Sequence, residues 1–183
     1  KALLEDSHDP QQADLILDRA CFEEMAQLAR DLDSRFLQRY VQLLVDVANL
    51  RTAVRVHRMG REPEFLRQVL LPGGSVSEQS IAAARGENLG DLFHTGGLAQ
   101  AAELGAKLAQ PGAGAMTDFE RACDDAVTAY LASERRVPFG EEPVVGYLYA
   151  REAEFTAIRT IFAGRAAKLE GDVIRRRLRE TYV

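Results

Sequence analysis

The sequence predicts an all-helical fold made of helical lobes that are related by an internal repeat. Apolar residues recur at steps of three, four and seven in several long stretches, and no window alternates convincingly at period two. Alanine, leucine, glutamate and arginine, which all favour helices, are abundant. Hydrophobic residues make up 46% of the chain and charged residues 28%, which is typical of folded rather than disordered proteins.

The first half of the chain is predicted to centre on a long helix from about Arg35 to Met59, preceded by a helix over 14–31. The long helix is apolar nearly all round in its middle, so we expect it at the centre of a helical bundle. Gly60 follows it as a stop signal. Further on, Ser75 and Glu78 have the spacing of a capping box and predict the start of a short helix.

The middle of the chain is rich in glycine and predicts only short helices over 88–108. A loop over 111–114 is the best boundary between subdomains, and a helix over 119–133 follows it. We therefore expect two lobes, one over 1–110 and one over 111–183.

The last forty-one residues predict two helices. The first has one apolar stripe, formed by Val144, Leu148, Phe155, Ile158 and Phe162. Gly164 is expected to be its left-handed C′ cap, and Asp172 the N-cap of the second helix. The second helix has an i, i+4, i+8 row of Ile174, Leu178 and Tyr182. We expect this row to dock on the first helix near Phe155–Phe162, leaving Arg175, Arg176 and Arg179 outward.

The two halves of the chain resemble each other. The run Leu17–Cys21 parallels Phe119–Cys123, and each run is followed by a long helix in which Arg55 and Arg159 hold matching places. An ordered set of such matches predicts stacked or rotationally related units, over about 14–74 and 119–183.

Several function classes find no support in the sequence. The net charge of −5 argues against a nucleic-acid partner, and the chain has no Walker loop, so we expect no direct nucleotide binding. The three histidines have no partner at metal-ligand spacing, so we expect no metal and no cofactor. The pair Asp124-Asp125 is similar to the aspartates of helical prenyl-binding enzymes, but no further aspartate lies on the same face.

Two sets of polar residues interrupt the apolar helices and are the candidate site residues. Asp46 and Asn49 are i, i+3 on the most apolar helix, where a hydrogen-bonded lock between helices is favoured over a ligand or metal site. The second set is interpreted as architectural ion pairs rather than acid–base catalysts, because Glu152 and Glu154 point to different faces. Its members are Arg51, Arg55, Arg151, Glu152, Glu154 and Arg159.

The end of the chain resembles a known family. Arg151-Glu152-x-Glu154, Ile158-Arg159-x-Ile161, Gly164-Arg165 and the closing Ile-Arg-x-Arg-Leu-Arg-x-x-Tyr-Val of 174–183 are similar to the C-terminus of the C-subunit family of V-type and A-type ATPases. In eukaryotic V-type ATPases the corresponding protein is called d. Asp46-x-x-Asn49-Leu-Arg51 is similar to a segment in the middle of the same family.

This resemblance implies a non-catalytic central-stalk subunit of a rotary ATPase that transports protons or sodium ions. Its partners would be the central shaft subunits and the membrane proteolipid ring, at the cytoplasmic side of the membrane. The family's pseudo-threefold, funnel-like fold would leave a third lobe before Lys1, so we expect the chain to be a fragment that lacks its N-terminal part. The alternative is a cytosolic helical-repeat adaptor or scaffold, and an enzyme is the least supported interpretation.

Overall fold

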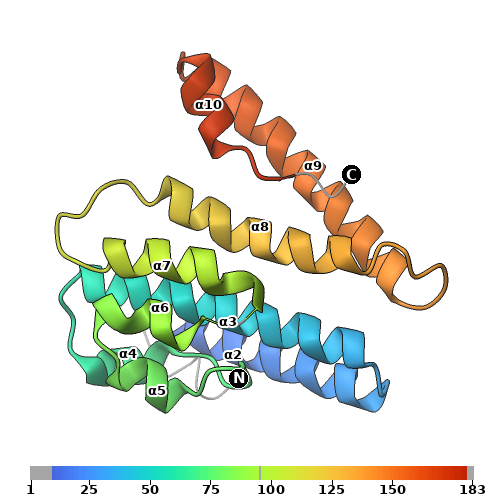
Figure 1. The fold of residues 1–183 in the computed structure, drawn as a ribbon, viewed down its shortest axis with the longest axis horizontal. Coiled ribbons are helices and arrows are strands. Elements are labelled where there is room, and N and C mark those ends of the chain that lie inside the picture. The colour runs from blue at the N-terminus through green and yellow to red at the C-terminus, as the bar shows by residue number, and fades with distance from the viewer. Residues whose placement is uncertain (1–9, 95, 181–183) are drawn as a thin grey trace.

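The computed structural model describes residues 10–94 and 96–180, and within these ranges every regular element is a helix. The all-helical prediction is confirmed. Figure 1 shows α3 (Arg35–Arg58) in the middle of the body. The helix α2 (Pro10–Asp31) lies along one side of α3, while α7 (Ala99–Leu108) and α8 (Thr117–Ser133) lie along the other.

Short elements close one end of this body. They are α4 (Pro63–Val69), α5 (Glu78–Ala83), α6 (Leu89–Leu92) and two 3₁₀ turns, Gly86–Asn88 and Gly96–Leu98. The glycine-rich sequence around them predicted short helices, and that is what the structure contains. Because each spans only one or two turns, these helices depend on packing against the longer ones for their stability.

The helix α3 has clear signals at both ends and is covered on several sides. The Ser34 hydroxyl oxygen accepts a hydrogen bond from the Leu37 backbone N–H at 3.1 Å, which satisfies one free donor of the first turn. After its last turn, Gly60 has a φ of +63°, a conformation that costs glycine little. Leu50, Ala53 and Val54 are fully buried, as expected for a helix that is apolar all round.

The hydrophobic core lies between α3 and the helices around it. Fully buried side chains from α3, α4, α5, α6, α7 and α8 meet there, among them Leu50, Leu66, Ile81, Leu89, Ala102 and Phe119. The core thus contains residues from both sides of position 110, where the sequence predicted a boundary between lobes. The division into lobes 1–110 and 111–183 stays a prediction.

The predicted capping box at Ser75 and Glu78 is wrong. The N-cap of α5 is Ser77, whose hydroxyl oxygen accepts from the Ser80 backbone N–H at 3.1 Å. Ser75 is bound to Asp46 of α3 instead. Ser75, which the local pattern assigned to the cap, therefore makes its hydrogen bonds with a helix that is distant in the sequence.

The last two helices extend away from the body. The helix α9 (Glu142–Ala166) begins beside the end of α8 and diverges from it, and α10 (Gly171–Arg177) folds back beside the far end of α9 (Figure 1). Gly164 was predicted to cap α9, but the helix continues past it to Ala166, so this prediction is wrong. The left-handed residue after α9 is Lys168, with a φ of 55°.

Gly164 instead allows close packing between α9 and α10. It is buried, and a Cβ atom built on it would lie 2.7 Å from Cγ1 of Ile174. The N-cap of α10 is Glu170 rather than the predicted Asp172, which lies inside the first turn and pairs with Arg175 at 2.8 Å.

Candidate functional site

Asn49 joins α3 to the segment that follows α4. Its side-chain amide donates to the Leu71 carbonyl oxygen at 2.8 Å, and its side-chain oxygen accepts from the Leu71 backbone N–H at 2.8 Å. Asn49 is only 1% exposed. Both backbone groups of Leu71 are satisfied by one side chain, so Asn49 fixes a non-helical segment to α3, where the sequence predicted a lock between helices.

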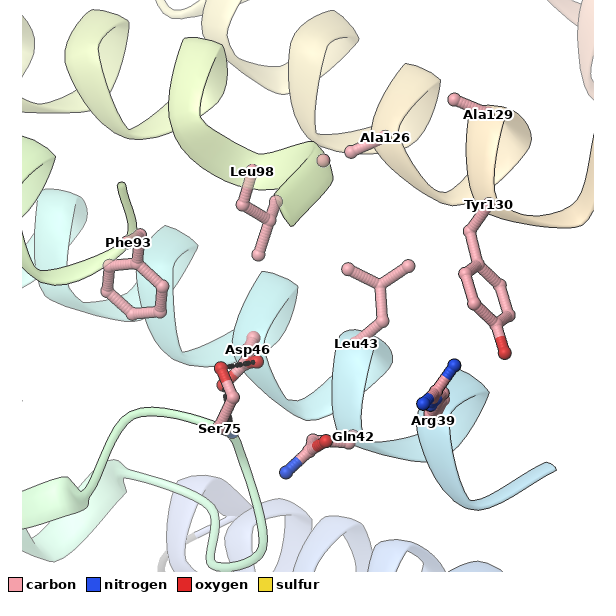
Figure 2. Close-up of a pocket in the computed structure, with 11 residues that line it drawn as sticks. Arg39, Gln42, Leu43, Asp46, Ser75, Phe93, Leu98, Ala126, Ala129 and Tyr130 are labelled. Atoms are coloured by element: carbon pink, nitrogen blue, oxygen red, sulfur yellow. Dashed lines mark hydrogen bonds between the residues drawn. The ribbon is translucent and has the colours of Figure 1, made fainter. Parts of the chain in front are cut away.

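Asp46, one turn earlier on α3, holds the next part of the same segment. Its carboxylate accepts from the Ser75 backbone N–H at 2.8 Å and from the Ser75 hydroxyl group (Figure 2). Burial raises the pKa of Asp46, while the hydrogen bonds from Ser75 and Val76 act in the opposite direction. Glycine is needed at Gly74, because a Cβ there would overlap Asp46 Oδ1.

A cleft of about 800 Å³ lies between α3, α8 and the segments around Ser75 and Leu98 (Figure 2). Two polar side chains in its lining already have structural partners: Asp46 binds Ser75, and the Tyr130 hydroxyl donates to the Phe36 carbonyl oxygen at 2.9 Å. The rest of the lining is mostly carbon, apart from the polar side chains of Arg39 and Gln42, which come from α3. This surface favours packing over acid–base chemistry.

An ion-pair network connects α3 to α8. Arg51 Nε lies 2.8 Å from Glu120 Oε2, and Arg51 Nη2 also binds Asp124. Arg55 Nη2 lies 2.7 Å from the other oxygen of Glu120. Two arginines spaced i, i+4 on α3 therefore face two carboxylates spaced i, i+4 on α8.

The same network holds the segment after α10. Asp124 uses its second oxygen to bind Arg179 Nε, and Asp125 accepts from the Glu180 backbone N–H at 2.8 Å. The prediction that Arg179 points outward is therefore wrong, whereas Arg175 and Arg176 are exposed. The Asp124-Asp125 pair therefore binds the segment after α10 to α8, through Arg179 and the Glu180 backbone, rather than forming a prenyl-binding site.

The candidate residues on α9 do not meet those on α3. Arg151 pairs with Glu154 of its own helix and lies over the Phe155 ring at 5.2 Å from the ring centre. Glu152 and Arg159 lie on the same helix. Glu152 is near enough to Tyr40 of α3 to add to the rise in the pKa of that tyrosine, of which burial is the main cause. Arg51 and Arg55, which the sequence analysis grouped with these residues, bind carboxylates of α8 instead.

Ile174 of the terminal row docks on α9 as predicted, but at Gly164 rather than between Phe155 and Phe162. Ile174 is 8% exposed and packs on Gly164, and Leu178 is half-buried beside α8 residues in a second cleft. Tyr182 lies outside the described residues. Phe155 and Phe162, which were expected to receive the row, are 58% and 71% exposed.

Sequence reasoning missed Glu120, Asp124 and Asp125 as members of the network. The available signal was the matching spacing, since Glu120 and Asp124 are i, i+4 and so are Arg51 and Arg55. The sequence does not say that α3 and α8 are neighbours, and the two helices are about 70 residues apart along the chain.

No metal or nucleophile centre is evident in the described part of the chain. Within residues 10–94 and 96–180, no three His, Cys, Asp or Glu side chains are placed to hold a metal ion. Burial raises the pKa of the Cys123 thiol to about 12, so this thiol is protonated at neutral pH and is a poor nucleophile. Among the helices of these ranges, none is both long and apolar enough to span a membrane.

Comparison with known proteins gives consistent matches. The family model described as "ATP synthase (C/AC39) subunit" matches residues 2–177. The C subunit of the A-type ATP synthase of Halorubrum lacusprofundi is 30% identical over 162 residues, which cover 86% of this chain and 46% of the relative. The C subunit of the V-type sodium ATPase of Enterococcus hirae is 22% identical over 179 residues, covering 97% and 54% respectively.

A shorter match links the chain to the C subunit of the V-type ATP synthase of Thermus thermophilus, with 34% identity over 64 residues, or 35% of this chain and 20% of the relative. The chain spans about half the length of the curated relatives that it matches most fully. No solved structure matches it significantly.

Proposed function

Because the chain belongs to the ATP synthase (C/AC39) subunit family, we propose that it is part of a non-catalytic central-stalk subunit of a V/A-type rotary ATPase. In this role it couples the central shaft to the membrane proteolipid ring, at the cytoplasmic side of the membrane, during proton or sodium ion transport. The observation on which the proposal rests is the family match, which extends over residues 2–177.

The structure supports a mechanical role through its cross-links. A body that transmits torque must resist shear between its helices. Asn49 and Asp46 join α3 to the segment over 71–76, and Arg51 joins α3 to α8. These contacts lie between elements distant in the sequence, and each is at least partly buried. Hydrogen bonds to charged groups contribute more to stability at such positions than at the surface.

The internal repeat is also part of this proposal. We propose that 14–74 and 119–183 are related units of a pseudo-threefold, funnel-like fold. Phe119 and Cys123 of α8 are fully buried, whereas their counterparts Leu17 and Cys21 of α2 are exposed. If the two units are related, other parts of the protein cover α8 but not the corresponding side of α2. Superposition of the two ranges tests this point, and different helix orders or crossing directions would contradict it.

The function is tested by recovery of the complex. An affinity-tagged copy of the protein is purified from gently solubilised membranes of its native cells, and the co-purifying proteins are identified and quantified. We expect shaft and proteolipid subunits in constant ratio to the tagged protein, and ATPase activity in the eluate that the purified chain lacks. Recovery from the soluble fraction, without any other component of a rotary ATPase, would favour the adaptor alternative instead.

A further inference from the structure

The outward side of α9 presents a long apolar stripe. Six large side chains on it are 43–71% exposed: Val144, Tyr147, Leu148, Phe155, Ile158 and Phe162. From the first to the last, they extend about 27 Å along the helix at the usual rise per residue. Arg151 lies on the same side between Leu148 and Phe155, over the ring of Phe155, so the stripe consists of two apolar stretches that flank one arginine. Isolated exposed apolar residues are common, but six large ones along one side of a helix are typical of an interaction surface.

The opposite side of α9 is already used for packing. Gly146 and Gly164 are buried, Val145 and Tyr149 pack against the main core, and Gly164 receives Ile174. The helix is therefore apolar on two opposite faces. Helices of this kind lie inside a larger protein body or within a membrane.

Protein, rather than lipid, is the matching environment. Among the described helices, none is long and apolar enough to cross a membrane, and α9 has four charged side chains between positions 151 and 159. Two of these are arginines and two are glutamates, so their charges cancel. The face therefore selects an occupant by apolar shape and not by net charge.

The size of the face agrees with a specific contact. Six partly exposed aliphatic and aromatic side chains offer roughly 700 Å², close to the ~800 Å² that each partner contributes to a standard interface. One amphipathic helix laid along α9 would cover this area.

The relatives suggest which segment this is. The chain spans 46%, 47% and 54% of three curated relatives, so about half of each relative lies outside the match. We propose that the outer face of α9 docks a helical segment from that other half of the family chain, through an apolar stripe at steps of three and four. This inference rests on family membership and not on the rotor role, so either can fail while the other stands.

The test uses co-expression, which does not require either part to fold alone. The tagged 183-residue chain is co-expressed with the part of the Halorubrum lacusprofundi relative that lies outside the matched range. The variant is L148S/F155S, on the outer face of α9. The matched control is L17S/L28S, which replaces two apolar residues of α2 that are 57% and 54% exposed.

We expect a one-to-one complex with the wild type and with the control, and at least tenfold lower recovery of the partner with the α9 variant. The variant's melting temperature, measured on the 183-residue chain alone, should match that of the wild type, because both replaced side chains are exposed. Absence of a complex with the wild type, or equal recovery by the variant, would overturn the proposal. So would a homodimer of the isolated chain that the α9 variant abolishes, since the occupant would then be a second copy.

Discussion

Ile174 packs directly over Gly164, and this contact joins the last two helices of the chain. A Cβ atom on Gly164 would lie 2.7 Å from Cγ1 and 2.9 Å from Cδ1 of Ile174. Real Cβ atoms do not approach carbon so closely, so Ile174 would have to leave its χ1 rotamer, which is restricted in a β-branched residue, or α10 would have to shift. The glycine is therefore needed for its small size, since the helix continues past it with ordinary helical backbone.

Substituting Gly164→Ala should destabilise the protein. Overpacking costs ~1–3 kcal/mol, and the better helix propensity of alanine returns up to ~1 kcal/mol. We expect a net loss of about 1–2 kcal/mol and a melting temperature lower by several degrees, measured by circular dichroism. Gly171→Ala is the control, because nothing lies within 4 Å of a Cβ at that position. Equal melting of both variants would show that α10 is not packed on Gly164.

Asp46→Asn should change how stability depends on pH. Burial raises the pKa of Asp46 above its ordinary value of 3.8, so the folded protein binds this proton more tightly than the unfolded chain does. The resulting stabilisation is fully present below pH 3.8 and is lost as pH rises through the raised folded pKa. Asparagine keeps the shape and can still accept from the Ser75 N–H.

The wild type should therefore lose stability relative to Asp46→Asn as pH increases from about 4 towards neutral. The measurement is urea unfolding of both proteins at several pH values, and the informative quantity is the difference between their free energies of unfolding. Acid-sensitive ion pairs elsewhere affect both proteins equally and cancel in this difference. A difference that is constant across the pH range would contradict the prediction.

The contact between Asp124 and Arg179 should couple the end of the chain to α8. Their side chains are 33% and 30% exposed, so their ion pair is only partly screened by water. A double-mutant cycle with D124A and R179A is expected to give a coupling free energy of about 1 kcal/mol that decreases in high salt. The control cycle uses Asp172 and Arg175, which pair at 79–84% exposure and should show almost no coupling. Coupling of equal size in both cycles would mean that the Asp124–Arg179 ion pair stabilises the protein no more than an exposed ion pair does.

The purified chain should neither bind nor hydrolyse ATP. The sequence has no phosphate-binding loop, and the proposed role needs none. Isothermal titration calorimetry with ATP and Mg²⁺ should give only the heat of dilution. Saturable binding in the micromolar range would contradict both this expectation and the non-catalytic role.

Local patterns were enough to predict the elements of the fold. The apolar periodicity of α3, with Gly60 after it, predicted the helix, its approximate ends and its central position. The same all-round apolarity placed Asp46 and Asn49 where polar groups need partners, and the structure shows both groups hydrogen-bonded at low exposure. Such features depend on residues that are near one another in the sequence, so the sequence alone contains them.

Assignments that required neighbours to be known failed, and so did the cap assignments at Ser75, Gly164 and Asp172. The apolar stripe of α9 was expected to receive the terminal helix, but the structure leaves Phe155 and Phe162 exposed and seats Ile174 on Gly164.

By itself, then, the sequence determined the all-helical class, the central helix and the family resemblance. Only the tertiary structure decided that Arg51 binds Glu120 and Asp124 of α8, that Arg179 turns inward to Asp124, and that α9 is apolar on two faces with one uncovered. The physical reason is that periodicity gives each helix an apolar face but not the element that covers it. Which face meets which depends on packing between segments tens of residues apart, and so do the partners of the charged side chains.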